Sequence, residues 1–144
     1  MKRNYFDAQQ LAVKSYGRAL EPVCRQWSLT RNELDVLLFL ANNPGLDRAA
    51  DIVTNRGMTK SHVSLSVTNL ENHGLLRRRE DSRDRRTVHL ELTDAAWEIA
   101  QAGREAQKAY FGCLFRGVSR EEMDAWETIL EKVCENITRM ASES

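Results

Sequence analysis

The sequence predicts a mainly α-helical fold of the α+β type, in which one β-hairpin interrupts a series of helices. Apolar residues recur every three or four positions through most of the chain, which is typical of helices with one buried face. Residues 87–92 instead alternate polar and apolar side chains, as in a strand with one buried face. The predicted order is four helices, a hairpin and two helices, and the length of 144 residues predicts a single domain, 1–144.

The first two helices are predicted from an apolar stripe and from a capping signal. Residues 5–27 carry apolar side chains at helical spacing, and we expect Pro22 to kink this helix or end it early, because proline lacks a backbone donor. The second helix begins at Thr30, since Thr30 and Glu33 form a capping box, and the turn residues 42–45 end it.

Two short helices follow. Asp47 is expected to cap the third helix, which runs through about Asn55, and Thr59 to cap the fourth, which Gly74 ends. The buried face of the fourth helix is predicted to consist of Val63, Val67 and Leu70.

The hairpin comes next. Strands are predicted at 75–80 and 86–92, joined by the polar turn 81–85. Two short adjacent helices with a glycine-containing turn between them, followed by a two-stranded hairpin, form a helix-turn-helix with a wing, here about residues 30–93.

Two longer helices complete the chain. Thr93 and Asp94 cap a fifth helix that runs to about Arg116, and a second capping box at Ser119–Glu122 opens the sixth. The apolar residues of the sixth helix are spaced alternately three and four positions apart and form one stripe: Met123, Trp126, Leu130, Val133, Ile137 and Met140.

The charge distribution favours nucleic-acid binding although the net charge is zero. Residues 93–144 hold ten acidic and six basic side chains, so the excess of positive charge lies in the rest of the chain. Six arginines fall within residues 77–86, where only three acidic residues offset them. Clustered arginine is the electrostatic footprint of phosphate binding. The alternative is a solvated hairpin with charges of both signs.

The fourth helix has the composition of a helix that reads the DNA major groove. Its outward residues are short or hydrogen-bonding and are densest in the first turns, from which a recognition helix reaches base edges. We expect DNA contacts from Thr59, Lys60, Ser61, His62, Ser64, Leu65 and Thr68, with Leu65 placed to touch a thymine methyl group. The alternative is an ordinary amphipathic surface helix.

The wing supplies the second set of candidate DNA contacts. Arginine at the tip of a hairpin is suited to the narrow, negative minor groove. The predicted DNA-binding site of the wing is Arg83, Asp84, Arg85 and Arg86. The arginines are the candidates for direct contact, and we expect Asp81 and Asp84 to brace them through bidentate ion pairs.

Taken together, these motifs resemble the multiple antibiotic resistance regulator (MarR) family. The segment Ser61–Ser64 through Gly74–Leu76 is similar to the family's recognition helix and its exit into the wing, Asp81–Arg86 to its wing motif, and Leu90–Thr93 to its closing strand. Upstream, Leu29–Leu37 resembles the entry to the family's second helix. One departure is Leu65, which stands where many members carry a basic or polar residue.

The resemblance implies a winged-helix homodimer. Helices at about 5–27 and 94–141 would form the dimerisation part, and the two recognition helices would bind a pseudo-palindromic operator on double-stranded DNA. The implied function is a sequence-specific repressor that a small ligand releases. Two alternatives remain: the terminal stripes serve only the core of one chain, and the winged helix is a protein-interaction module.

The resemblance also implies a choice of effectors. A small aromatic effector would bind between the dimerisation helices and the DNA-binding lobe. The candidate lining residues are Tyr16, Arg18, Arg25, Trp27, Trp97 and Tyr110. The alternative is that the aromatic residues among them belong to the core. A thiol-based redox sensor is an alternative with Cys24 beside Arg25 as its candidate, whereas Cys113 and Cys134 are expected to be inert core residues. The three histidines lack metal-ligand spacing, so no metal is expected.

Other function classes find no support in the sequence. It has no glycine-rich phosphate loop, no His-Glu-x-x-His and no nucleophile elbow, so we expect neither an enzyme nor a cofactor. No apolar run approaches the length of a membrane span, and the N-terminal residues lead into no apolar stretch, so we expect a cytoplasmic protein. Three widely spaced cysteines argue against a disulfide framework.

Overall fold

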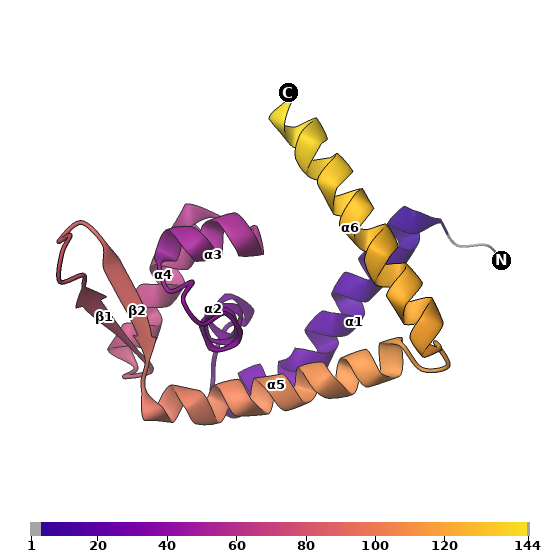
Figure 1. Cartoon of the computed structure of the whole chain (residues 1–144). Helices are drawn as coiled ribbons and strands as arrows, with labels where there is room; N and C mark the ends of the chain where they lie inside the picture. The colour runs from indigo at the N-terminus through magenta and orange to yellow at the C-terminus, as the bar shows by residue number, and fades with distance from the viewer. Residues whose placement is uncertain (1–3, 144) are drawn as a thin grey trace. The chain divides into compact units, whose positions relative to one another are not determined.

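The computed structural model describes residues 4–143 and confirms the predicted fold class (Figure 1). Within these residues six helices and one two-stranded antiparallel sheet follow one another in the predicted order. The elements are α1 Tyr5–Gln26, α2 Arg31–Asn42, α3 Ala49–Arg56, α4 Lys60–Asn72, β1 Leu76–Glu80, β2 Val88–Leu92, α5 Asp94–Leu114 and α6 Arg120–Ser142. No helix in this part of the chain is long and apolar enough to cross a membrane.

The chain divides into two compact units, one through Tyr110 and one from Phe111 onward. The first unit holds the hydrophobic core and the whole helix-turn-helix and hairpin. The second holds the last residues of α5 and all of α6.

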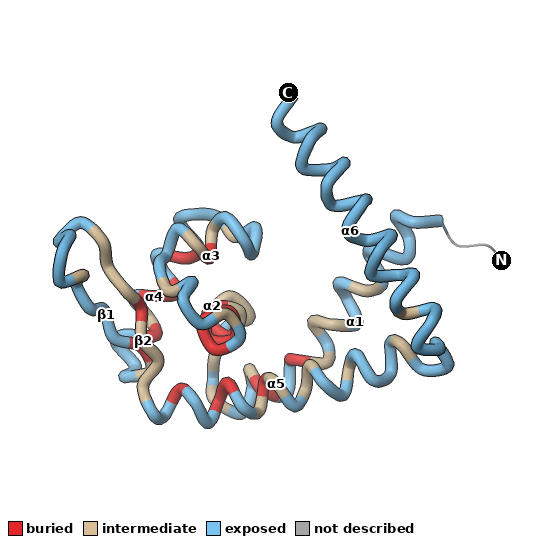
Figure 2. The backbone as a smooth tube through the Cα atoms, viewed as in Figure 1, coloured by how far each residue is buried: buried red, intermediate tan, exposed pale blue. Residues whose placement is uncertain are grey.

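Helix α2 is the centre of the first unit (Figure 2). Eight of its twelve residues are buried, and α1, α3, α4 and β2 all pack against it. A helix that is buried on nearly every side must be apolar on nearly every side, which explains the continuous apolar run of residues 36–41. Every element that carries a candidate DNA contact is therefore anchored, directly or through α4, to this helix.

The start of α2 is fixed by the capping box that the sequence predicted. The backbone N–H of Glu33 donates to Oγ1 of Thr30 at 3.2 Å, and the backbone N–H of Thr30 donates to Oε1 of Glu33 at 3.1 Å. Glu33 is only 5% exposed, so these bonds and the positive end of the helix dipole stabilise a buried carboxylate.

Helix α1 ends close to the predicted boundary, whereas α3 departs from expectation at its N-cap. Helix α1 continues through Pro22 to Gln26 and does not end early. Asp47 does not cap α3: the N-cap is Arg48, whose backbone N–H donates to Oδ2 of Asp51 at 3.0 Å. The side chain of Asp47 is engaged instead by the wing, which sequence periodicity does not reveal.

The hairpin is also shorter than predicted. Its strands pair in register from Leu76↔Leu92 to Glu80↔Val88, so the connecting loop covers residues 81–87. The hydroxyl of Thr93 donates to the carbonyl of Gly74 at 2.8 Å and ties the end of the hairpin to the end of α4.

The terminal helices expose much of their apolar surface in the single chain. In α1 only Leu20 and Val23 are buried, and α6 has no buried residue. The stripe of α6 that is exposed comprises Trp126, Leu130, Val133, Ile137 and Met140. The expectation that Cys113 and Cys134 are core residues is wrong for the single chain, in which both are exposed.

Replacing Gly103 by alanine is expected to destabilise the protein relative to the same change at Gly112. Both glycines lie in α5, so both substitutions gain similar helix propensity. A β-carbon at Gly103 would lie 2.7 Å from Cδ2 of the buried Leu38, whereas one at Gly112 meets nothing within 4 Å. We expect the two unfolding free energies to differ by about 1–3 kcal/mol in urea denaturation. Equal effects would contradict the close packing of α5 on α2.

Candidate nucleic-acid interface

A short turn joins α3 to α4 and sets the start of α4. Gly57 ends α3 with φ of 70°, a left-handed conformation that favours glycine. Thr59 then caps α4 as predicted, because its side chain accepts the backbone N–H of His62 at 3.1 Å. At the other end of the turn, Arg56 donates to Asp35 of α2 at 3.2 Å and fixes the last turn of α3.

The two faces of α4 divide as the sequence predicts. Val63, Val67 and Leu70 are buried, and so is Ser66, which the apolar periodicity does not mark. Leu65 is 62% exposed, a large apolar side chain left on an otherwise polar surface. The predicted DNA-contacting residues of α4 and its cap are all exposed: Thr59, Lys60, Ser61, His62, Ser64, Leu65 and Thr68.

Arg78 joins the hairpin to α4. Its Nη2 donates to Oγ1 of Thr68 at 3.2 Å, and its Nε lies 3.5 Å from Oε1 of Glu71. Arg79 on the same strand pairs with Glu91 of β2 at 2.5 Å. Two arginines of the cluster therefore hold the wing in place, a role that sequence reasoning did not assign to them.

The wing loop is organised by its two aspartates. Oδ1 of Asp81 accepts the backbone N–H groups of Arg83 and Asp84 at 2.8 and 3.1 Å. Oδ1 of Asp84 accepts the backbone N–H of Arg86 at 3.0 Å, and its Oδ2 accepts the hydroxyl of Thr87 at 3.3 Å. The expectation that these aspartates brace guanidinium groups is wrong: they cap backbone turns, as short acidic side chains do in loops.

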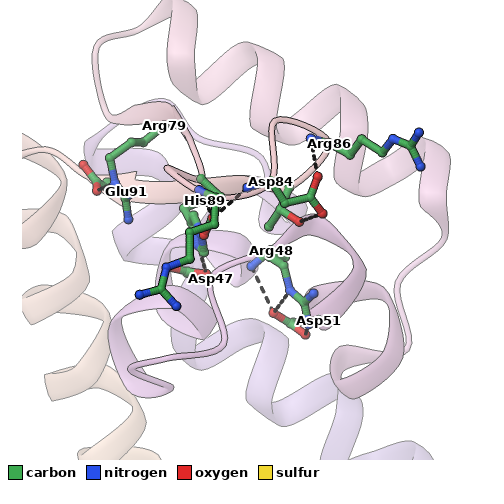
Figure 3. Close-up of polar contacts among 11 residues, drawn as sticks. Asp47, Arg48, Asp51, Arg79, Asp84, Arg86, His89 and Glu91 are labelled. Carbon is green, nitrogen blue, oxygen red and sulfur yellow. Dashed lines mark hydrogen bonds and ion pairs between the residues drawn. The ribbon is translucent and has the colours of Figure 1, made fainter.

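Because the two aspartates bind backbone groups, the positive charges of the wing arginines are not neutralised by them. The guanidinium groups of Arg83, Arg85 and Arg86 make no ion pair or hydrogen bond within residues 4–143, and all three residues are exposed. In Figure 3 the side chain of Arg86 extends away from Asp84 while its backbone is held by that carboxylate. The loop thus orders the backbone without neutralising the arginines.

At its base the wing is bound to the connection between α2 and α3. His89 of β2 lies between Asp47 and Asp81, with Nδ1 at 2.7 Å from Oδ1 of Asp47 and Nε2 at 2.8 Å from Oδ2 of Asp81 (Figure 3). The bond from His89, with those from the backbone of Arg83 and Asp84, lowers the pKa of Asp81 to about 2. His89 was not among the predicted site residues, since alternation alone marks it only as a residue on the polar face of a strand.

A largely apolar hollow of about 660 Å³ lies between α3, α4 and the hairpin. It is lined by Ala49, Ala50, Val53, Thr54, Lys60, Ser61, Val63, Ser64, Val67, Arg78, Val88 and Leu90. None of the six residues predicted to line an effector pocket belongs to it.

The structure brings together only two of those six residues. The rings of Tyr16 and Tyr110 lie 5.3 Å apart, and the hydroxyl of Tyr16 accepts a hydrogen bond from Gln107 at 2.7 Å. Arg31 stacks over the Tyr16 ring at 4.8 Å.

The other four candidates are separate from this pair. Trp27 is half-buried against the core, and Arg104 stacks over Trp97 at 5.5 Å from its ring centroid. Arg18 is exposed, and Arg25 is exposed and paired with Glu21 at 2.6 Å. The effector pocket remains a prediction.

The surroundings of Cys24 do not favour a thiolate. Burial raises the pKa of the Cys24 thiol, and the opposing effect of Arg31 is smaller. The neighbouring guanidinium of Arg25 is engaged by Glu21. The thiol-sensing hypothesis requires a lowered pKa, which this environment does not provide. Among the described residues no cluster of His, Cys, Asp and Glu is arranged to hold a metal ion.

Comparisons with known proteins point to one family. Residues 27–87 match the model of the MarR family. The transcriptional repressor MprA of Escherichia coli K12 is 28% identical over 87 residues, which are 60% of this chain and 49% of MprA, so the match spans about half the length of that relative.

Solved structures share the fold. A MarR-family regulator from Listeria monocytogenes, solved with a 26-mer DNA, has a TM-score of 0.82 at 18% identity, covering 95% of this chain and 90% of its own. BpsR of Bordetella bronchiseptica, from a study of its regulation by 6-hydroxynicotinic acid, has a TM-score of 0.71 at 20% identity, covering 92% and 94% of the two chains.

Replacing Asp84 by alanine is expected to loosen the wing loop without unfolding the protein. The change removes the acceptor of the Arg86 N–H and the Thr87 hydroxyl, each bond being worth about 0.5–1.5 kcal/mol. We expect the Arg86 amide to exchange with deuterium roughly fivefold faster, which mass spectrometry of the loop peptide measures. Ser82→Ala in the same loop is the control. Unchanged exchange in Asp84→Ala would show that the aspartate does not order the loop.

Proposed function

The winged-helix segment of this chain belongs to the MarR family of DNA-binding transcription regulators, and from that premise we propose that the protein is a homodimeric repressor of a pseudo-palindromic operator. The observation that carries the proposal is the pairing of two surfaces. One is the exposed polar face of α4, which packs against β1. The other is the loop after β1, whose backbone is held at Arg83, Asp84 and Arg86 and whose three arginine guanidinium groups are unpaired.

In this proposal α4 reads the major groove. Thr59, Lys60 and Ser61 lie at the helix N-terminus, where the backbone N–H groups and the helix dipole also attract a phosphate. His62 and Ser64 are short enough to reach base edges, and Leu65 contacts a thymine methyl group. Thr68 already accepts a hydrogen bond from Arg78, so its part is to hold the wing beside the groove.

The wing supplies affinity more than sequence information. Arg83, Arg85 and Arg86 bind phosphates and the narrow minor groove, where a negative potential attracts guanidinium groups. Asp84 does not contact DNA in this account, because both of its oxygens are engaged within the loop.

Dimerisation is supported by the exposed stripe on α6. Monomeric proteins rarely leave a long apolar stripe in water, so we propose that a second copy of the chain covers it. A two-fold dimer would place two copies of α4 about one helical turn of DNA apart, which fits an inverted repeat.

The proposal also includes repression of transcription and release from DNA by a small ligand. MprA is named a repressor, and the BpsR study concerns regulation of DNA binding by an aromatic acid; we propose the same type of control here. An effector that binds one arrangement of the two recognition helices better than another would shift their spacing and weaken DNA binding. We further propose that the protein acts in the cytoplasm, where its DNA target would be accessible.

Removing two wing arginines is expected to weaken binding and reduce its salt dependence. In Arg85→Ala/Arg86→Ala the logarithmic slope of affinity against salt should fall by about 2, since each phosphate contact contributes about 0.9, and affinity at physiological salt should drop about tenfold. Fluorescence anisotropy with a labelled operator across a salt series measures both.

The matched control is Arg18→Ala/Arg25→Ala, which removes the same charge from α1 and should leave the slope unchanged. If the wing double variant kept the slope and affinity of the wild type, the arginines would not contact DNA. The alternative of a protein-interaction module, with the arginines facing an acidic protein surface, would then be preferred.

Placing a charge in the α6 stripe is expected to prevent dimer formation. In Leu130→Glu a carboxylate would have to be buried without a partner, and we expect the dimer to weaken at least tenfold. Sedimentation velocity should show the particle mass falling from twice the chain mass to 16.5 kDa. Thr128→Glu, two positions from both Trp126 and Leu130 and so away from the stripe, is the control. A monomeric wild type would contradict the dimer.

A further inference from the structure

His89 occupies an unusual position at the base of the wing. It lies in the middle of β2, and its side chain is only 19% exposed, although the strand faces water on that side. Its two ring nitrogens each contact a carboxylate, at 2.7 Å to Asp47 and 2.8 Å to Asp81. These carboxylates come from different segments, the connection before α3 and the loop after β1.

This geometry specifies the protonation state of the ring. A neutral imidazole has one N–H donor and one nitrogen lone pair, so it can donate to only one of the two carboxylates. Its other nitrogen and the second carboxylate oxygen would then both be acceptors, with no proton between them. Only the imidazolium carries two N–H donors and satisfies both contacts, and its positive charge strengthens each bond.

The two carboxylates connect the His89 ring to the segment before α3 and to the arginine loop. The carbonyl of Asp47 accepts the backbone N–H of Leu90 at 2.7 Å, so Asp47 fastens β2 through its backbone as well as its side chain. The other oxygen of Asp81 holds the backbone turn of Arg83 and Asp84, from which the wing arginines project. His89 is therefore the link between the helix-turn-helix and the arginine loop.

We propose that His89 is a positioning residue that holds the arginine loop against the helix-turn-helix while its ring is protonated and releases the loop when the ring loses its proton. DNA affinity then decreases as the ring loses its proton with rising pH. This inference rests on the proposed DNA-binding function, which it deepens by adding a proton-dependent control of the wing.

The charges around the ring determine the direction of the effect. Asp47 and Asp81 face it directly and raise the pKa of His89, while Arg79, opposite it on β1, lowers that pKa but is itself paired with Glu91. A folded pKa above the unfolded value of 6.5 means that the stabilisation is complete below pH 6.5. It is lost as the pH rises through the raised, folded pKa. The partner carboxyl Asp81 stays ionised throughout this range, because its own pKa is about 2.

The first test needs no DNA. Carbon-detected or proton NMR of the imidazole in the full chain should give His89 a pKa above the 6.5 of an unperturbed histidine. The amide resonances of Arg83 and Asp84, whose N–H groups donate to Asp81, should shift with the same midpoint. Asp47→Asn keeps the shape of the side chain but removes one charge, and it should lower the pKa of His89. A His89 pKa at or below 6.5, or loop amides that do not follow it, would overturn the proposal.

The second test measures operator affinity from pH 6 to pH 9 at constant salt. We expect the wild type to bind about fivefold more weakly at the alkaline end, a factor typical of losing one charge-assisted hydrogen bond. His89→Gln should bind weakly at every pH and lose this dependence, because its amide has no titrating proton. His62 on α4 also belongs to the proposed interface, so His62→Gln is judged by the shape of its pH profile and not by its affinity, and the decrease with rising pH should persist in it.

The possible results distinguish a failure of the His89 role from a failure of the proposed DNA-binding function. A wild type that binds its operator equally at pH 6 and pH 9, or a pH profile that disappears in His62→Gln but persists in His89→Gln, would overturn the role of His89. Absence of operator binding at every pH would instead overturn the proposed function, and the NMR titration would then decide independently whether His89 links the loop to the helix-turn-helix.

Discussion

The burial of α2 is the constraint on which the rest of the structure depends. Because α1, α3, α4 and β2 all pack against this one helix, the position of each element that carries a proposed DNA contact depends on how that element packs there. Among residues 4–143 the one buried carboxylate is that of Glu33, which is satisfied locally by the Thr30 cap and adds no unpaired charge to the core.

The wing shows how charge is divided between structure and function. Arg78 and Arg79 are neutralised by Glu71 and Glu91 and hold the hairpin to α4 and to itself. Asp81 and Asp84 use their oxygens on backbone N–H groups, so the arginines at the tip are left for an external anion. A zero net charge is therefore compatible with a strongly basic local surface, because most acidic residues lie elsewhere or are already engaged.

The sequence predicts those features whose signals are local. Element order, the Thr30 and Ser119 caps, and the inward and outward faces of α4 all follow from residues within one or two turns of each other. Contacts between distant segments carry no such signal. From the sequence, Asp47 is predicted to cap a helix, but the structure places His89, 42 residues later, beside its carboxylate. The aspartates of the wing are predicted to pair with arginine side chains, but they accept hydrogen bonds from the loop backbone. The exposure of Cys113 and Cys134 likewise depends on what covers α5 and α6, which one chain does not specify.

In the proposed function, two copies of α4 and of the wing act together on one duplex. The most direct measurement is selection of bound duplexes from a random DNA pool by the purified wild-type protein at near-physiological salt. We expect enrichment of an inverted repeat whose half-sites lie about one helical turn apart. Enrichment of a single unrepeated site would contradict the paired arrangement, and no enrichment at all would contradict sequence-specific DNA binding.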